Sequence, residues 1–145
     1  MRFCVSVSLS VMACNGGADV GELALNFELS DEQQAIYDMA KSFGRDEIEP
    51  HAVDWDQARH FPVDVSRKTA QLGLAGIYTR EEHGGSGVSR WDATLVFEAL
   101  SEACPSISAF ISIHNMVAWM VDSFGNEEQR RHWVPQLVSM EKIAS

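Results

Sequence analysis

A glycine-rich segment is the first place in the sequence where the backbone could bind a phosphate. The segment Gly84-Gly85-Ser86-Gly87 contains the residue type that lets backbone amides come close to an anion. No Lys-Ser/Thr pair follows it, as in a P-loop, and it lacks the G-x-G-x-x-G spacing of dinucleotide sites. Two interpretations stay open: a phosphate cradle, and the favoured one, a helix-connecting loop that needs glycine conformations.

Histidine, serine and cysteine form no catalytic or metal-binding pattern. The five histidines have neither H-x-x-x-H nor H-E-x-x-H spacing, which disfavours a zinc site. No serine lies in a G-x-S-x-G turn. The cysteines Cys4, Cys14 and Cys104 are an odd number without metal-ligand spacing, so we expect free thiols and no disulfide framework. The residues themselves therefore indicate no metal site and no catalytic residue.

A polar pair lies in the most apolar part of the sequence. No charged residue occurs from Ala103 through Val121, yet this stretch contains His114 and Asn115. Polar groups inside a core need hydrogen-bond partners. Either the pair lines a ligand cavity or it hydrogen-bonds between helices, and the second interpretation is favoured.

The elements that must position these groups are helical. A capping box at Ser30-Asp31-Glu32-Gln33 precedes apolar residues at helical spacing, and Pro50 is the expected stop. Phe61-Pro62 indicates a second helix, which we expect over 63–72 and which ends before Gly73.

The second half of the chain predicts further helices. A helix that opens at Ser89 has one apolar face, formed by Ala93, Val96, Phe97 and Leu100, and Cys104-Pro105 interrupts it. Residues 105–124 form a central, buried helix that is too diluted by polar residues to span a membrane. Asn126 caps another helix, which we expect Pro135 to limit. The sequence thus predicts an all-α bundle of five or six helices.

Charge excludes two classes of partner. The 145 residues contain 11 Lys and Arg against 21 Asp and Glu, for a formal net charge of −10. Most of the excess negative charge lies in residues 28–60, and no segment is basic. Nucleic-acid binding and adsorption to anionic membranes both need clustered cations, so both are disfavoured. The length fits one domain.

Residues 1–27 do not resemble the rest and are left out of the fold. Arg2 precedes an apolar run, and small residues follow it, which outlines a weak secretory signal. A mitochondrial transit peptide would be rich in Arg and poor in acids, unlike this stretch with Asp19 and Glu22. The alternation of valines with serines also resembles a strand. We treat the segment as unassigned: a targeting remnant or a gene-model artefact.

The chain from Leu29 to Ser145 resembles the N-terminal helical domain of the acyl-CoA dehydrogenases. The resemblance is carried by Leu29-Ser30-Asp31-Glu32-Gln33, Gly84-Gly85-Ser86-Gly87-Val88-Ser89 and Phe124-Gly125-Asn126-Glu127-Glu128-Gln129-Arg130. Further runs resemble the mitochondrial, valine-pathway branch of the family: Phe61-Pro62-Val63-Asp64-Val65, Ile111-Ser112-Ile113-His114-Asn115-Met116 and Met140-Glu141-Lys142-Ile143-Ala144-Ser145.

The resemblance implies a domain organisation and an activity. Residues 28–145 would be the N-terminal helical domain, with the family's middle β domain and C-terminal helical domain absent from this chain. The intact protein would be an FAD-dependent enzyme that oxidises a short branched-chain acyl-CoA, expected to be isobutyryl-CoA, to the 2-enoyl-CoA. It would pass electrons to electron-transferring flavoprotein, form a homotetramer and lie in the mitochondrial matrix.

The resemblance also implies which residues touch the substrate. Ser112, Ile113 and Met116 would line the closed end of the acyl tunnel, where large side chains favour short branched chains. The catalytic base would lie in the absent C-terminal domain, and no residue here is assigned to FAD. The chain alone is expected to be inactive. The alternative is a truncated, non-catalytic helical module that acts only through protein–protein packing.

Overall fold

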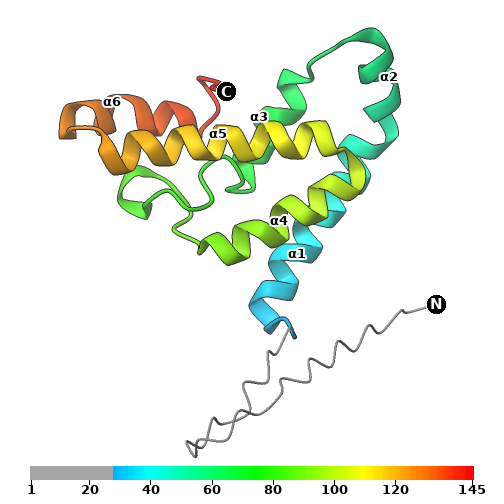
Figure 1. Cartoon of the computed structure of the whole chain (residues 1–145), viewed down its shortest axis with the longest axis horizontal. Coiled ribbons are helices and arrows are strands. Elements are labelled where there is room, and N and C mark those ends of the chain that lie inside the picture. The colour runs from blue at the N-terminus through cyan, green and yellow to red at the C-terminus, as the bar shows by residue number, and fades with distance from the viewer. Residues whose placement is uncertain (1–27) are drawn as a thin grey trace, which may run out of the picture.

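The structure, a computed structural model, describes residues 28–145, in which all regular elements are helices (Figure 1). The interpretations given above for residues 1–27 lie outside the described part. The α-helices are α1 (Asp31–Phe43), α2 (Ala52–Ala58), α3 (Val63–Gln71), α4 (Arg90–Ala103), α5 (Pro105–Phe124) and α6 (Glu127–Val138). No strand occurs within residues 28–145, so the predicted all-α bundle of five or six helices is confirmed.

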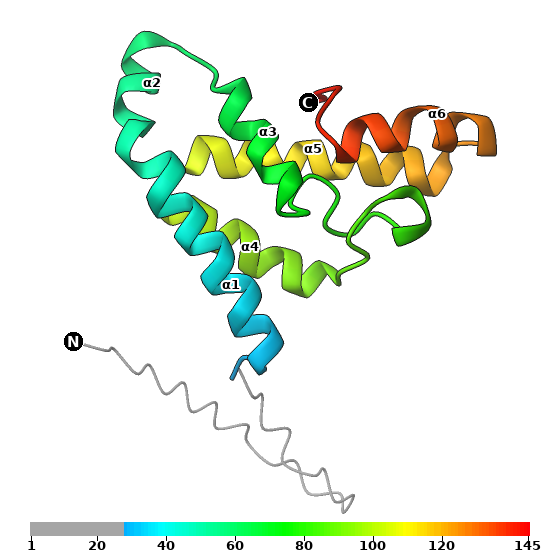
Figure 2. The ribbon, with the colours of Figure 1, turned by 180° about the vertical axis from the view of Figure 1, so that it is seen from behind.

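Neighbouring helices form a series in which each packs on the next. Helix α1 packs on α4, α4 packs on α5, and α5 packs on α6. The two opposite views agree: α5 runs across the molecule with α4 on one side and α6 along its carboxyl-terminal half, while the carboxyl end of the chain returns towards the middle of α5 (Figures 1 and 2). Helix α5 is therefore the element that the other parts of the fold share.

The helix starts lie where the sequence places them. Ser30 and Gln33 form a reciprocal capping box at α1, and Asn126 and Gln129 form a second one at α6. The Ser89 hydroxyl accepts a hydrogen bond from the backbone amide of Asp92 at the start of α4. Each cap satisfies an amide that the helix itself leaves without a partner.

Two proline predictions need correction. The first helix ends at Phe43, before Pro50, and the chain stays helical through a π-helical segment, Gly44–Ile48, and a 3₁₀ turn, Glu49–His51. Pro50 fits there because it occupies an early position of the 3₁₀ turn, where its missing amide is not needed.

Pro135 does not limit the last helix, which continues to Val138. A proline inside a helix removes one backbone hydrogen bond and typically costs about 3 kcal/mol. The burial of Val134 and Leu137 on the inner face of α6 offsets this cost. The carbonyl of Pro135 itself still takes part in a backbone hydrogen bond, because it accepts from the amide of Ser139.

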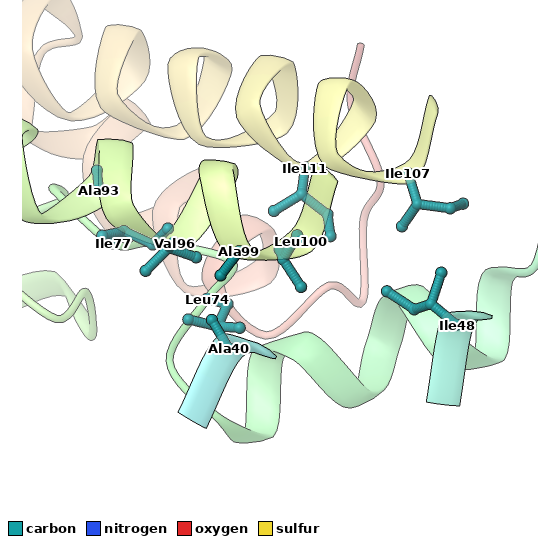
Figure 3. Close-up of a cluster of buried hydrophobic side chains, with 10 residues drawn as sticks. All are labelled: Ala40, Ile48, Leu74, Ile77, Ala93, Val96, Ala99, Leu100, Ile107 and Ile111. Carbon is teal, nitrogen blue, oxygen red and sulfur yellow. The ribbon is translucent and has the colours of Figure 1, made fainter. Parts of the chain in front are cut away.

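The core lies where α1, α4 and α5 meet (Figure 3). Of the predicted apolar face of α4, Ala93, Val96 and Leu100 are buried and Phe97 packs against the cluster while partly exposed. Figure 3 shows Ile111 and Ile107 reaching from α5 into the same cluster. This packing fixes the side of α5 that faces inward and hence the side that faces outward.

Candidate functional site on helix α5

Helix α5 has the bounds that the sequence predicts, because Pro105 occupies its first turn and Gly125 ends it. Its inward face is not purely apolar. Alongside isoleucines and an alanine, it buries four polar side chains: Ser108, His114, Asn115 and Asp122. Each of them has a hydrogen-bond partner in another segment of the chain, and Ser108 donates its hydroxyl hydrogen bond to Phe97 O in α4.

Asn115 joins α5 to the segment that follows α3. Its Oδ1 accepts a hydrogen bond from the backbone amide of Ile77 at 2.7 Å, and its Nδ2 donates to Leu74 O at 2.8 Å. The same Nδ2 also donates to Ile111 O at 2.9 Å. The side chain is fully buried, so these bonds replace water completely.

His114 joins α5 to α6 and to the carboxyl-terminal segment. Its Nε2 lies 2.9 Å from Leu137 O, and its Nδ1 accepts a hydrogen bond from the backbone amide of Ala144 at 3.2 Å. Since an amide can only donate, the ring is neutral with its proton on Nε2. The favoured interpretation of the polar pair, hydrogen bonding between helices, is therefore confirmed for His114, which bonds to α6, whereas Asn115 bonds to the segment that follows α3.

The prediction that residues 105–124 form a buried helix is wrong for the outer side of α5, where large apolar side chains are exposed. Ser112, Ile113 and Met116 lie together on this outer side. Spacings of three and four residues bring Met116 beside the other two on the helix surface. Ile113 is 40% exposed and Met116 is 46% exposed, while the half-buried Ser112 donates its hydroxyl hydrogen bond to Ala109 O. Met120 and Phe124 extend this exposed apolar stripe towards the end of the helix. Contact of these residues with an acyl group stays a prediction.

A cleft of about 350 Å³ opens beside this stripe. Its lining comes from α5, α6 and the carboxyl-terminal segment: Val117, Val121, Trp133, Leu137, Lys142, Ile143 and Ala144. Apolar side chains form most of the wall, and Lys142 is its one charged residue. The size and lining suit a small apolar group.

The sequence reasoning missed this cleft, although one signal for it was present. Val117 and Val121 follow Ile113 at intervals of four residues, so all three lie along one row of α5. The contribution of α6 and of residues 142–144 could not be read from spacing, because it depends on how the chain returns to α5.

The glycine-rich segment is a loop whose backbone amides are already used. The amides of Gly84, Gly85, Ser86 and Gly87 donate to Glu81 O, Arg80 O, Gly76 O and Thr79 O, respectively. Gly84 and Gly87 have positive φ angles of 91° and 63°, and a side chain on Gly85 would meet the Thr79 carbonyl oxygen. The loop interpretation is therefore confirmed, and the phosphate cradle is not supported.

The same geometry tests whether this chain could hold FAD. The loop has no free amides for a pyrophosphate, and within residues 28–145 no group of three or more His, Cys, Asp or Glu could hold a metal ion. The glycine-rich loop therefore offers no cradle for the pyrophosphate of FAD. Cys104 is a free thiol, as expected, whereas Cys4 and Cys14 lie outside the described part.

An ion pair anchors the glycine-rich loop to α5. Arg80 Nη2 lies 2.9 Å from Asp122 Oδ1, and the same guanidinium nitrogen donates to Asp122 O at 2.8 Å. Burial alone raises the pKa of the Asp122 carboxyl, but the hydrogen bonds and charge of Arg80, with a smaller effect of His83, outweigh it and leave that pKa below its usual value. The sequence reasoning did not find this pair.

A family model described as the N-terminal domain of acyl-CoA dehydrogenases matches residues 30–141 of this chain. The chain belongs to the acyl-CoA dehydrogenase family. Its helices are those of the family's N-terminal domain, and the predicted family resemblance is confirmed. None of the helices in the described part is long and apolar enough to cross a membrane.

Sequence and structure comparisons agree on the family. The chain is 51% identical over 117 residues to mitochondrial isobutyryl-CoA dehydrogenase from Dictyostelium discoideum and 49% identical over 117 residues to the same enzyme from Bos taurus. In both cases the match covers 81% of this chain and 28% of the relative. Butyryl-CoA dehydrogenase from Megasphaera elsdenii superposes with a TM-score of 0.74 at 25% identity, over 82% of this chain and 32% of that structure.

The chain spans just over a quarter of the length of the two isobutyryl-CoA dehydrogenases it matches. The buried His114 and Asn115 account for how α5 is held, whereas the exposed stripe lies on the other side of the helix, next to the cleft.

Proposed function

We propose that this chain is the N-terminal helical part of an FAD-dependent acyl-CoA dehydrogenase that oxidises isobutyryl-CoA to the 2-enoyl-CoA. The observation that carries the proposal is the 49–51% identity to two isobutyryl-CoA dehydrogenases. In the proposed enzyme, residues 28–145 are the helical domain, and a β domain and a C-terminal helical domain complete it. Valine catabolism is the process that such an activity serves.

The chain's part in this reaction is to shape and dry one side of the acyl site. Ser112, Ile113 and Met116 form the wall, with the cleft at Val117 continuing it. An apolar wall excludes water from a reacting thioester and strengthens electrostatic interactions near it. It also rejects longer chains by contact, a selectivity of roughly 1–3 kcal/mol for each methylene.

The catalytic base, the FAD and most of its contacts belong to the other two domains of the proposed enzyme. This assignment agrees with the glycine-rich loop, whose amides all have acceptors within the chain. Electron-transferring flavoprotein is the proposed electron acceptor, the proposed assembly is a homotetramer, and the proposed location is the mitochondrial matrix. The location is supported by the two isobutyryl-CoA dehydrogenases, both of which are mitochondrial enzymes.

Activity measurements on two forms of the protein test the proposal. A polypeptide of the relatives' length that contains this chain is expected to bind FAD and to oxidise isobutyryl-CoA in preference to butyryl-CoA and 2-methylbutyryl-CoA. The 145-residue chain alone is expected to show no flavin absorbance and no acyl-CoA oxidation. A preference for a straight-chain substrate would refute the substrate, and stoichiometric flavin on the short chain would refute the division of roles.

A further inference from the structure

Both hydrogen-bond partners of the His114 ring line the cleft between α5, α6 and the carboxyl-terminal segment. The ring bonds to Leu137 O through Nε2 and to the Ala144 amide through Nδ1. Leu137 and Ala144 are two of the residues that form the cleft wall. His114 itself is fully buried behind that wall. One ring therefore ties together two walls that come from different parts of the chain.

We infer that His114 is a positioning residue that sets the width of this cleft and thereby the size of the acyl group it accepts. The inference rests on the proposed function, because the acyl group is the ligand assigned to this side of α5. Val117 and Val121 fix one wall on the helix that carries His114. The distance to the facing walls then depends on where the ring holds Leu137 and Ala144.

The geometry of an imidazole suits this task better than that of other polar side chains. Its two nitrogens point in different directions, so one can donate to a carbonyl while the other accepts from an amide. An asparagine places its oxygen where Nδ1 lies and keeps only the contact with Ala144. A glutamine places its amide where Nε2 lies and keeps only the contact with Leu137. These two substitutions separate the two contacts.

The first test measures amide hydrogen exchange in the 145-residue chain. We expect the Ala144 amide to exchange at least about fivefold faster in His114→Gln than in the wild type, which corresponds to the loss of one hydrogen bond. In His114→Asn its protection should be retained. The matched control is His60→Gln, the same change at an exposed histidine away from the cleft.

A second pair of variants leaves the buried ring untouched. Ala144→Pro removes the donor amide from the partly exposed carboxyl-terminal segment, whereas Ala144→Gly keeps it. Neither change alters a core side chain, so both variants should fold even if the His114 variants do not. A comparison of Ala144→Pro with Ala144→Gly then still tests the contact between the Ala144 amide and His114.

The second test measures kinetics in the full-length enzyme. We expect His114→Gln and Ala144→Pro to raise KM for isobutyryl-CoA about fivefold, with kcat within about twofold, since no reacting group is changed. The preference for isobutyryl-CoA over hexanoyl-CoA should fall about tenfold, within the range that one or two methylenes normally control. Ala144→Gly keeps the donor amide but loses a methyl of the cleft wall, so it should change KM and preference less than Ala144→Pro does. His60→Gln, at an exposed histidine away from the cleft, should keep the wild-type KM and preference.

The outcomes separate this inference from the proposed function. Unchanged Ala144 exchange in His114→Gln, or faster exchange with wild-type chain-length preference, would overturn the positioning role. A loss of kcat without a change in KM or preference would also overturn it, because a damaged fold explains that pattern. A wild-type enzyme that oxidises no acyl-CoA refutes the proposed function, whereas the exchange test requires no activity.

Discussion

Helices α4 and α5 pack against each other but differ in the polar side chains that they bury and in the apolar side chains that they expose. Helix α4 buries Leu95, Val96 and Leu100 and exposes Glu98 and Glu102. Its one large exposed apolar side chain is Trp91, in the first turn of the helix. Helix α5 buries several polar side chains and exposes large apolar ones: the buried set is Ser108, His114, Asn115 and Asp122, and the exposed set is Ile113, Met116, Met120 and Phe124.

The difference shows that the two helices have different tasks. The distribution on α4 is what apolar burial alone produces, so α4 serves stability. On α5, the buried polar side chains bond to several other parts of the chain: α4, the segment after α3, Arg80, the end of α6 and the carboxyl-terminal segment. They determine where α5 lies, and its outer apolar stripe adds little to the stability of residues 28–145.

Removing the Asn115 amide should have the largest effect on stability. Asn115→Leu has a similar volume but leaves the Ile77 amide and the Leu74 carbonyl without their partner. Each buried polar group without a partner costs about 1–3 kcal/mol, so we expect the free energy of unfolding to fall by about 4 kcal/mol. Chemical denaturation followed by circular dichroism measures this change.

The control for Asn115→Leu is Ser112→Ala, which removes only a local hydrogen bond on the same helix. Its free energy of unfolding should stay within about 0.5 kcal/mol of the wild type. If Asn115→Leu were as mild as Ser112→Ala, the buried polar groups would not hold α5 and the contrast with α4 would disappear.

Truncation of a core side chain on α4 should be the next largest effect. Leu100 is fully buried in the cluster that joins α1, α4 and α5. Leu100→Ala removes apolar contacts and leaves a cavity, for which we expect a loss of about 3 kcal/mol in the free energy of unfolding. The matched change at an exposed site, Leu72→Ala, should cost far less. Equal losses at both sites would show that α4 does not carry the core.

Local signals in the sequence account for most of the fold. The bounds of α5 were predictable because Pro105 favours a helix start and Gly125 a helix end at their own positions, whatever the rest of the chain does. The end of α6 was not predictable from local signals, because a proline normally ends a helix. The helix continues past Pro135 because the burial of Val134 and Leu137 offsets the cost of the proline. Propensity is local, whereas burial depends on the whole chain.

The candidate site was predictable in part for the same reason. The row of Ile113, Val117 and Val121 follows from helical periodicity. The identity of the His114 partners does not, because Leu137 and Ala144 are 23 and 30 residues further along the chain. The Arg80–Asp122 pair was also missed, because its two residues are 42 positions apart and meet only in the folded chain.

The Arg80–Asp122 pair should make stability depend on pH, with a smaller effect than the two core changes because Arg80 is about half exposed and water screens it. Arg80 holds the pKa of the Asp122 carboxyl below its unfolded value near 3.8, against the effect of burial. The ionised carboxylate therefore stabilises the fold above about pH 4, and this contribution is lost as the pH falls through the lower, folded value.

Asp122→Asn tests this contribution. The variant should be less stable than the wild type at pH 7, and the difference should shrink as the pH falls below about 4. Denaturation midpoints measured between pH 2.5 and 7 check the slope. A difference that is constant over this range would show that the charge of Asp122 plays no part.

The smallest effect on stability should come from the outer stripe of α5, and it completes the comparison with α4. Met116 and Met120 are 46% and 47% exposed, so Met116→Gln and Met120→Gln remove little buried apolar surface. We expect the free energy of unfolding to stay within about 0.5 kcal/mol of the wild type. The double variant should also bind less of an apolar dye such as 8-anilinonaphthalene-1-sulfonate, because the stripe is part of the apolar surface that residues 28–145 leave exposed. If either single variant destabilised the chain as much as Leu100→Ala does, the outer face of α5 would be part of the core, and the acyl wall proposed for it would have to lie elsewhere.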